Sequence, residues 1–232
     1  LIDKTESCHR TDANYTAIWI SRLTVIVGPI LALLLRDELR GSLFYIVGAA
    51  MSLASAVLVM CVKFPFRAPE EGVHLVSIDR FFLPRGATIA LVIALITAAL
   101  GIMMTTRMTV EFCSSVMAGF VVAALALHIP AVKNARFASA VGNALAIIAI
   151  LAMFAHDDIF DATLKPMLFG FGIALSSSEQ LYKLLNSCDH CQRSTAESTY
   201  FLSSDGGLFL GIAAGWQLTT AVKSAEQVVL AL

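Results

Sequence analysis

Long apolar runs separated by short polar segments dominate this chain. A bilayer core about 30 Å thick needs roughly 20 apolar residues as a helix, and seven runs approach or reach that length. They cover about residues 16–35, 41–62, 87–106, 112–132, 137–155, 162–186 and 197–218, and an eighth begins near residue 225. None of them alternates apolar and polar residues as the strands of a membrane barrel do. The pattern therefore predicts an all-α polytopic membrane protein.

The basic residues between the runs predict an orientation. Ten Lys and Arg residues fall on the side that holds the N-terminal segment, Lys183 and the loops 63–86, 133–136 and 187–196, whereas five fall on the other side. Arg22 lies inside the first run and is counted on neither side. Because cytoplasmic loops carry the excess of Lys and Arg, we expect the N-terminal segment and the loop 63–86 to be cytoplasmic.

The two ends of the chain carry a weak internal repeat. Arg10 to Thr16 recurs 183 residues later as Arg193 to Thr199. The same offset superimposes Ser21 on Ser204, Gly28 on Gly211 and Ala32 on Gly215. Each copy leads from a polar segment with an Arg into an apolar run with small residues four apart. Two repeated halves in one orientation are typical of some transporter folds.

Composition narrows the class of protein. Apolar residues make up 58% of the chain and charged residues 14%, whereas soluble domains are about half apolar and a quarter charged. The net charge of −1 argues against nucleic acid as a partner, because phosphate binding needs a surplus of clustered Lys and Arg. Five cysteines are an odd number and imply no disulfide framework. The chain begins without Met and stops within an apolar run, so we expect it to be an internal piece of a longer protein.

Motifs at the ends of the runs carry a family resemblance. Gly28-Pro29 lies inside the first run, and Phe64-Pro65-Phe66-Arg67-Ala68-Pro69 and Asp79-Arg80-Phe81-Phe82-Leu83-Pro84 lie in the longest polar segment. Asp189-His190-Cys191-Gln192-Arg193 is followed by Ser198-Thr199-Tyr200-Phe201-Leu202. Together these motifs resemble the major facilitator superfamily (MFS) of transporters, and the loop phrases look like those of permeases common in Bacteroidetes-type bacteria.

The resemblance implies a truncated MFS-type helical bundle. Residues 1–62 resemble the end of the N-terminal half, residues 63–86 the central cytoplasmic loop, and residues 87–232 most of the C-terminal half. The chain would thus span helices five to eleven and the start of helix twelve, in a bacterial inner membrane. The glycine-proline signature of helix five is normally richer in Gly than it is here, which weakens an inference of antiport.

The leading functional hypothesis is transmembrane transport of a small solute by alternating access. The partners of such a transporter would be the solute, the lipid bilayer and protons as the candidate coupling ion. This hypothesis requires no cofactor, no metal and no enzyme activity. The alternative is an integral-membrane enzyme that acts on a lipid-linked or hydrophobic substrate, although His128 and His156 are isolated in the sequence. A membrane scaffold without transport is a third hypothesis.

Small residues and Pro mark candidate sites of helix packing or gating. Gly207, Gly211 and Gly215 recur every four residues and so share one helix face. Such a face lets another helix approach closely, either as static packing or as a sliding seam. Gly28 and Pro29 are expected to bend their helix, because Pro removes one backbone hydrogen bond.

Polar residues within the runs are the candidates for substrate binding or coupling, since charges inside a bilayer are costly. Glu179 and Gln180 lie in a polar stretch of the 162–186 run, Asp205 in the 197–218 run and Arg22 in the 16–35 run. The charges either line a cavity or gate, or lie close enough to an interface to be solvated. Three further residues, Tyr182, Asn143 and Trp19, also face a cavity for some rotations of their helices.

Two other patterns have structural rather than functional interpretations. Cys188-Asp189-His190-Cys191, with Cys8-His9 at the equivalent place of the repeat, has the residue types of a zinc site but lacks four ligands at a defined local spacing. We therefore predict no metal. Arg107 and Glu111 are four residues apart, which allows an ion pair on one helix turn.

Overall fold

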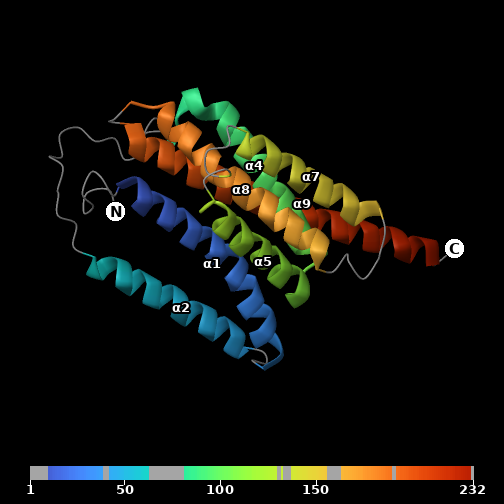
Figure 1. Ribbon diagram of the computed structural model, residues 1–232. Coiled ribbons are helices and arrows are strands. Elements are labelled where there is room, and N and C mark those ends of the chain that lie inside the picture. The colour runs from blue at the N-terminus through green and yellow to red at the C-terminus, as the bar shows by residue number, and fades with distance from the viewer. Residues whose placement is uncertain are drawn as a thin grey trace. The chain divides into compact units, whose positions relative to one another are not determined.

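Most of the described residues lie in helices. The computed structural model describes residues 10–38, 42–62, 81–129, 132, 137–155, 163–189 and 192–230, which contain no strand. The prediction of an all-α protein is therefore confirmed (Figure 1). The elements are α1 (Arg10–Glu38), α2 (Ser42–Cys61), the 3-10 helix η2 (Pro84–Gly86), α4 (Ala87–Thr106), α5 (Val110–Ala126), α7 (Ala138–Ala155), α8 (Leu164–Asn186) and α9 (Arg193–Leu230).

The chain divides into two compact units, Leu1–Leu75 and Val76–Leu232. In the first unit, α2 is apolar around its whole circumference and has no buried residue. Its Ser52 hydroxyl donates a hydrogen bond to the carbonyl oxygen of Gly48 at 3.0 Å, so this polar group is satisfied inside the helix. A helix that is apolar on every side is typical of a segment surrounded by lipid or by other helices.

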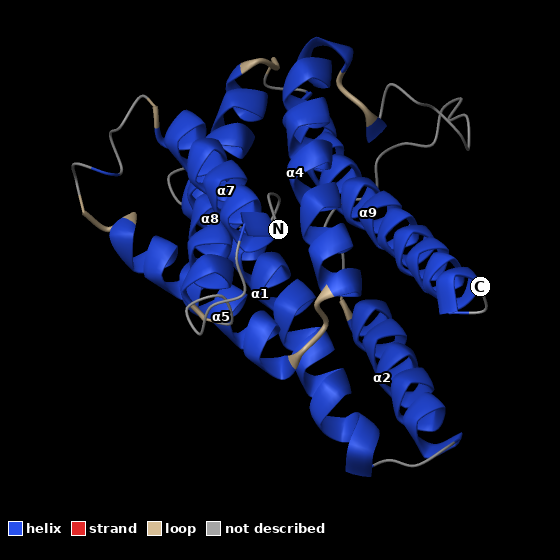
Figure 2. Cartoon of the chain, turned by 90° about the vertical axis from the view of Figure 1, so that its right-hand side faces the viewer, coloured by secondary structure: helices blue, strands red, loops and turns tan. Residues whose placement is uncertain are grey.

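The second unit is built around three helix pairings. α8 packs against both α5 and α7, and α4 packs along α9 (Figure 2). Gly170 and Gly172 lie at the contacts of α8 with α5 and with α7, respectively. A β-carbon on Gly170 would overlap the carbonyl oxygen of Val116 in α5, and one on Gly172 would lie 2.6 Å from that of Gly142 in α7. Only glycine lets these backbones approach so closely.

Three helical segments are long and apolar enough to cross a membrane, judged by length and composition among the described residues. They are Trp19–Arg36, Ser42–Cys61 and Pro84–Thr106. Val110–Ala126 and Ala138–Met153 are apolar but shorter. The remaining spans expected from the sequence, including the one that ends near residue 186, stay predictions.

Several helix boundaries differ from those expected. α1 begins at Arg10 instead of near 16, and α9 begins at Arg193 instead of near 197. The runs 197–218 and 225 onward were expected to be separate helices, but α9 continues through residues 219–224. That segment contains neither Gly nor Pro, and the hydroxyls of Thr219 and Thr220 bond back to the carbonyl oxygen of Trp216. α5 ends at Ala126 instead of near 132, because Pro130 disfavours helical backbone in the residue before it.

Candidate functional site

Four of the six buried polar residues described in the second unit lie on α7 and α8. Ser139 on α7 is buried, as are Ser176, Ser177 and Gln180 on α8. We call these four residues, together with Asn143 and Glu179, the α7–α8 seam. The two helices touch at Gly142, where a β-carbon would lie 2.6 Å from the carbonyl oxygen of Gly172 and 2.8 Å from the amide nitrogen of Ser176.

Glu179 caps the beginning of α7 from the neighbouring helix. Its Oε2 accepts a hydrogen bond from the backbone amide of Ser139, in the first turn of α7, where amides lack partners within the helix. Its Oε1 lies 2.7 Å from Lys183 Nζ. The Glu179 side chain is 16% exposed and that of Lys183 is 49% exposed. The carboxylate is therefore balanced by a cation and by the positive end of α7.

The other end of α7 is held by two cations. Arg107 Nη2 donates to the carbonyl oxygen of Met153 at 3.0 Å, and Lys165 Nζ donates to that of Ala152 at 2.9 Å. Both carbonyls belong to the last turn of α7, which is the negative end of its dipole. α7 is thus fixed at both ends by charges that complement its dipole.

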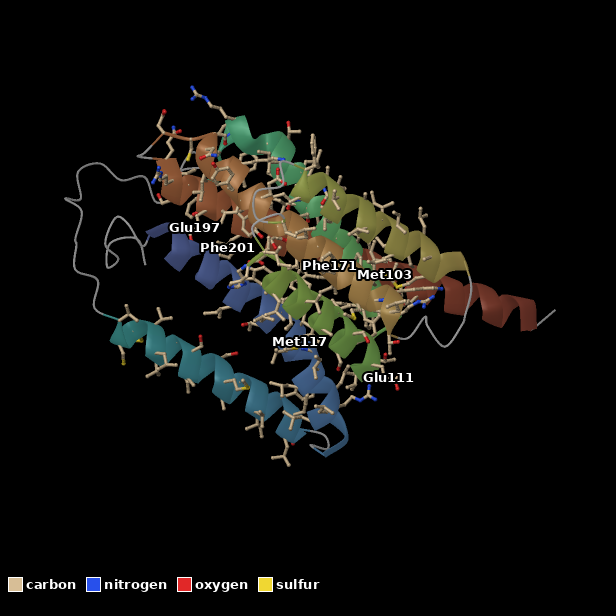
Figure 3. The ribbon with its side chains drawn as sticks, viewed as in Figure 1. Met103, Glu111, Met117, Phe171, Glu197 and Phe201 are labelled. Atoms are coloured by element: carbon tan, nitrogen blue, oxygen red, sulfur yellow. The ribbon has the colours of Figure 1, made fainter. Side chains whose placement is uncertain are left out.

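Arg107 and Glu111, whose spacing allows an ion pair, do not lie on one helix turn. α4 ends at Thr106 and α5 begins at Val110, so a helix break separates the two residues. Figure 3 shows Glu111 at one end of α5, and its side chain is exposed. The guanidinium of Arg107 instead bonds to α7.

Two polar atoms of the α7–α8 seam are buried and have no hydrogen-bond partner within the part of the chain that the structure describes. They are Gln180 Nε2, a donor, and Asn143 Oδ1, an acceptor. Gln180 is only 3% exposed. An unpaired buried polar group costs about 1–3 kcal/mol. Each of these groups therefore requires an explanation other than stability.

The serine hydroxyls next to Gln180 are already engaged as donors. Both Ser176 and Ser177 donate to the carbonyl oxygen of Ile173, one turn earlier on α8. A hydroxyl that donates still has lone pairs with which to accept. The α7–α8 seam therefore offers one unpaired donor and several acceptors.

The glycine stripe of α9 lies against α4. β-Carbons on Gly207 and Gly211 would overlap the carbonyl oxygens of Ala94 and Ala98, respectively, and one on Gly215 would overlap the Thr105 hydroxyl. The contact is reciprocal, because a β-carbon on Gly101 of α4 would lie 2.5 Å from the carbonyl oxygen of Leu208. The backbones of α4 and α9 are in van der Waals contact along this stripe.

One hydroxyl joins the beginning of α4 to α9. Thr199 Oγ1 accepts from the amide of Leu83 at 2.8 Å and donates to the carbonyl oxygen of Thr195 at 2.7 Å. Thr199 is fully buried. The sequence analysis missed this role, because a Thr in an apolar helix more often bonds only within its own helix.

The other predicted residues lie apart from the α7–α8 seam. Asp205 is exposed on α9, about 200° around the helix from Gly207 and therefore away from α4. Gly28 is exposed in α1, and a β-carbon there would meet nothing within 4 Å. Pro29 lies inside α1, which continues through it. The side chain of Arg22 falls outside the described part.

Of the remaining cavity candidates, neither lies in the α7–α8 seam. Tyr182 projects from α8 and is more than half exposed. Trp19 lies in α1 of the first unit and is partly exposed. The rotation of α8 therefore separates the buried Gln180 from the exposed Tyr182, which the sequence could not do.

The cysteine segment after α8 is described only in part. Cys188 Sγ donates to the carbonyl oxygen of Leu185 at 3.2 Å. Burial raises the pKa of the Cys188 thiol, and the nearby Arg193 partly offsets this effect. At neutral pH the group is therefore a thiol, whereas metals bind the thiolate. Cys8, His9, His190 and Cys191 lie outside the described residues.

Glycines also bring α5 and α8 close together. Figure 3 shows Met117 on α5 and Phe171 on α8, and a β-carbon on Gly119 would lie 2.7 Å from the amide nitrogen of Phe171. Close backbone contacts therefore lie on two sides of α8, against α5 and against α7.

Comparison of the chain with models of protein families, with curated proteins and with solved structures finds no match.

Proposed function

We propose that the chain is part of a secondary transporter of the MFS type, which moves a small solute across a bacterial inner membrane by alternating access. In this proposal residues 1–62 end the N-terminal half, residues 63–86 form the central cytoplasmic loop, and residues 87–232 belong to the C-terminal half. The N-terminal segment faces the cytoplasm. The proposal extends the observation of three apolar helical segments long enough to cross a membrane.

The observation that carries the proposal is the pair of unpartnered polar atoms on Gln180 and Asn143. Among apolar helices, buried polar groups without partners are costly, and they mark pathways for substrates more often than they contribute to stability. A membrane scaffold has no use for them. A transporter needs such groups, because they replace the water molecules that a solute gives up when it enters its binding site.

Two kinds of helix contact suit alternating access. The contact between α4 and α9 has three glycines at its centre and carries no ion pair among the described residues, so little opposes a small sliding motion. α7 is held on α8 at one end by Glu179 and at the other by Lys165. We therefore propose that α7 and α8 move as one body, and that α4 and α9 adjust against each other.

The coupling role is proposed for Asp205 rather than for Glu179. The carboxylate of Glu179 is already bound by Lys183 and by an amide of α7, so it serves to position that helix. Asp205 is exposed and free to face the parts of the protein that complete the cavity. Arg22, its counterpart in the repeat, stays a candidate for the opposite side of the gate.

The test is solute uptake by the complete protein in liposomes that contain a pH-sensitive dye. We expect saturable uptake of one class of small solute, accompanied by proton movement. Asp205→Asn should abolish the proton movement and leave solute binding intact, whereas Glu111→Gln, a second exposed carboxylate, should behave like the wild type. Normal proton-driven uptake by Asp205→Asn would remove Asp205 from coupling. Hydrolysis of a lipid-linked analogue without uptake would favour the enzyme alternative.

A further inference from the structure

We propose that the α7–α8 seam binds an uncharged amide or hydroxyl group of a small solute between Gln180 and Asn143. The inference rests on the proposed function and names its substrate class. Gln180 Nε2 would donate to the ligand, and Asn143 Oδ1 would accept from it. Both atoms would then gain the partner that the protein itself does not supply.

The register of the two helices brings the unpaired atoms close together along the α7–α8 seam. Ser139 pairs with Glu179, and Gly142 meets Ser176, so α7 and α8 run antiparallel. Asn143 follows Gly142 directly, and Gln180 follows Glu179 directly. With the contact of Gly172 against Gly142 and Ala146 included, the two residues are separated by about one and a half to two turns, or roughly 8–11 Å along the axis. A small solute that both side chains reach would bridge that separation.

The two side chains also turn to the same flank. At about 100° per residue, Asn143 is rotated forward from the α8-facing residues Gly142 and Ala146, and Gln180 is rotated forward from the α7-facing residues Gly172 and Ser176. Because the helices are antiparallel, forward rotations on both carry the side chains to one side of the pair. The flank is that of Leu184, one turn after Gln180, which packs on Gly86 before α4.

The charges around the α7–α8 seam select an uncharged ligand. The only described ion pair there joins Glu179 to Lys183, and the carboxylate is also bound by the amide of Ser139. A charged ligand would bring an uncompensated charge into a site of low dielectric, which is costly. The acceptors on Asn143 and Ser176 favour a ligand with more than one donor, as a primary amide or a polyol has.

The experiment uses three probes that share one hydroxyl-bearing carbon frame. Lactamide is neutral, lactate is an anion and isopropanolamine is a cation. Binding of each to the purified protein in lipid nanodiscs is measured by saturation-transfer NMR of the ligand. We expect lactamide to bind, and Gln180→Leu to weaken its binding by about tenfold or more, which corresponds to the loss of one buried hydrogen bond.

The control is Gln217→Leu, which makes the same change at an exposed position of α9 and should leave lactamide binding unchanged. Asn143→Leu provides a second test if Gln180→Leu does not fold. Equal binding of lactamide by the wild type and by both seam variants would overturn the inference. So would a preference for lactate or isopropanolamine, or no lactamide binding by the wild type, which would leave water as the partner of both atoms.

The inference and the proposed function fail in different ways. Lactamide binding that depends on Gln180, without uptake of any solute by the complete protein, would support the binding site and contradict transport. Saturable uptake with lactamide binding that is indifferent to Gln180 would support transport and contradict the site.

Discussion

Two helix contacts of the second unit, that of α4 with α9 and that of α7 with α8, are stabilised in opposite ways. Along α4 and α9 the backbones touch through glycines, and one hydroxyl, that of Thr199, supplies a polar link at the beginning of α4. Along α7 and α8 the backbones also touch at Gly142, but charges hold both ends of α7 and two polar atoms between them lack partners. The first contact therefore depends on shape, and the second depends on charge and on unsatisfied polar groups.

The largest effect on stability is expected from a substitution that changes the shape of the α4–α9 contact. Gly211→Ala places a methyl group on the carbonyl oxygen of Ala98, a backbone atom that cannot move aside without separating the helices. We expect the free energy of unfolding to fall by about 3 kcal/mol. The control is Gly206→Ala on the same helix, where a β-carbon meets nothing within 4 Å, and a gain of up to about 1 kcal/mol follows from helix propensity alone. Reversible unfolding in mixed micelles measures both, and equal effects would contradict close backbone contact at Gly211.

The second-largest effect is expected at Thr199, whose hydroxyl makes the polar link in the α4–α9 contact. Thr199→Val keeps the shape but leaves the amide of Leu83 without its partner. We expect a loss of about 2 kcal/mol in the free energy of unfolding. Hydrogen exchange at Leu83 should accelerate locally. Unchanged exchange there would mean that the amide has found water instead. Thr106→Val, where the exposed hydroxyl bonds only within α4, is the matched control and should change stability little.

The contact between α7 and α8 is tested through its cap. Glu179→Ala removes the acceptor for the amide of Ser139 and the charge at the beginning of α7. We expect a loss of about 1–2 kcal/mol. Glu179→Gln should lose less, because an amide oxygen can still accept from Ser139. If the two variants are equally destabilised, the charge of Glu179 matters and its hydrogen bond does not.

The smallest expected effect has the opposite sign. Gln180→Leu replaces a buried donor that lacks a partner with an apolar side chain of similar size. We expect the unliganded protein to gain about 1 kcal/mol in the free energy of unfolding. A loss of stability would show that Gln180 contributes to the packing of the α7–α8 seam. Gln217→Leu, which is exposed, serves as the reference.

The helical class could be predicted from the sequence because it depends on local pattern. Apolar runs of the required length become helices, and the spacing of Gly207, Gly211 and Gly215 indicated a face of close packing without naming α4 as the partner. The end of a helix near residue 218 was wrongly expected, because a drop in hydropathy does not end a helix when Gly and Pro are absent.

The residues of the candidate site could be predicted from the sequence, but their arrangement could not. Gln180 and Asn143 were recognised as polar residues in apolar runs, but their rotation depends on which neighbour each helix chooses. Glu179 was considered as a coupling group, whereas its partner is an amide 40 residues away, which no local pattern reveals. The interaction of Arg107 with the end of α7 was missed for the same reason.

The cap that Glu179 places on α7 has a consequence for the order of assembly. If α7 and α8 both cross a bilayer, as we propose, α8 must carry a carboxylate into it, which an isolated helix does at a cost of a few kcal/mol. Chains are synthesised from the N-terminus, so α7 is already present when α8 emerges and can offer the amide of Ser139 to that carboxylate. Exchanging the order of the two helices along the chain would deprive this carboxylate of its partner during synthesis.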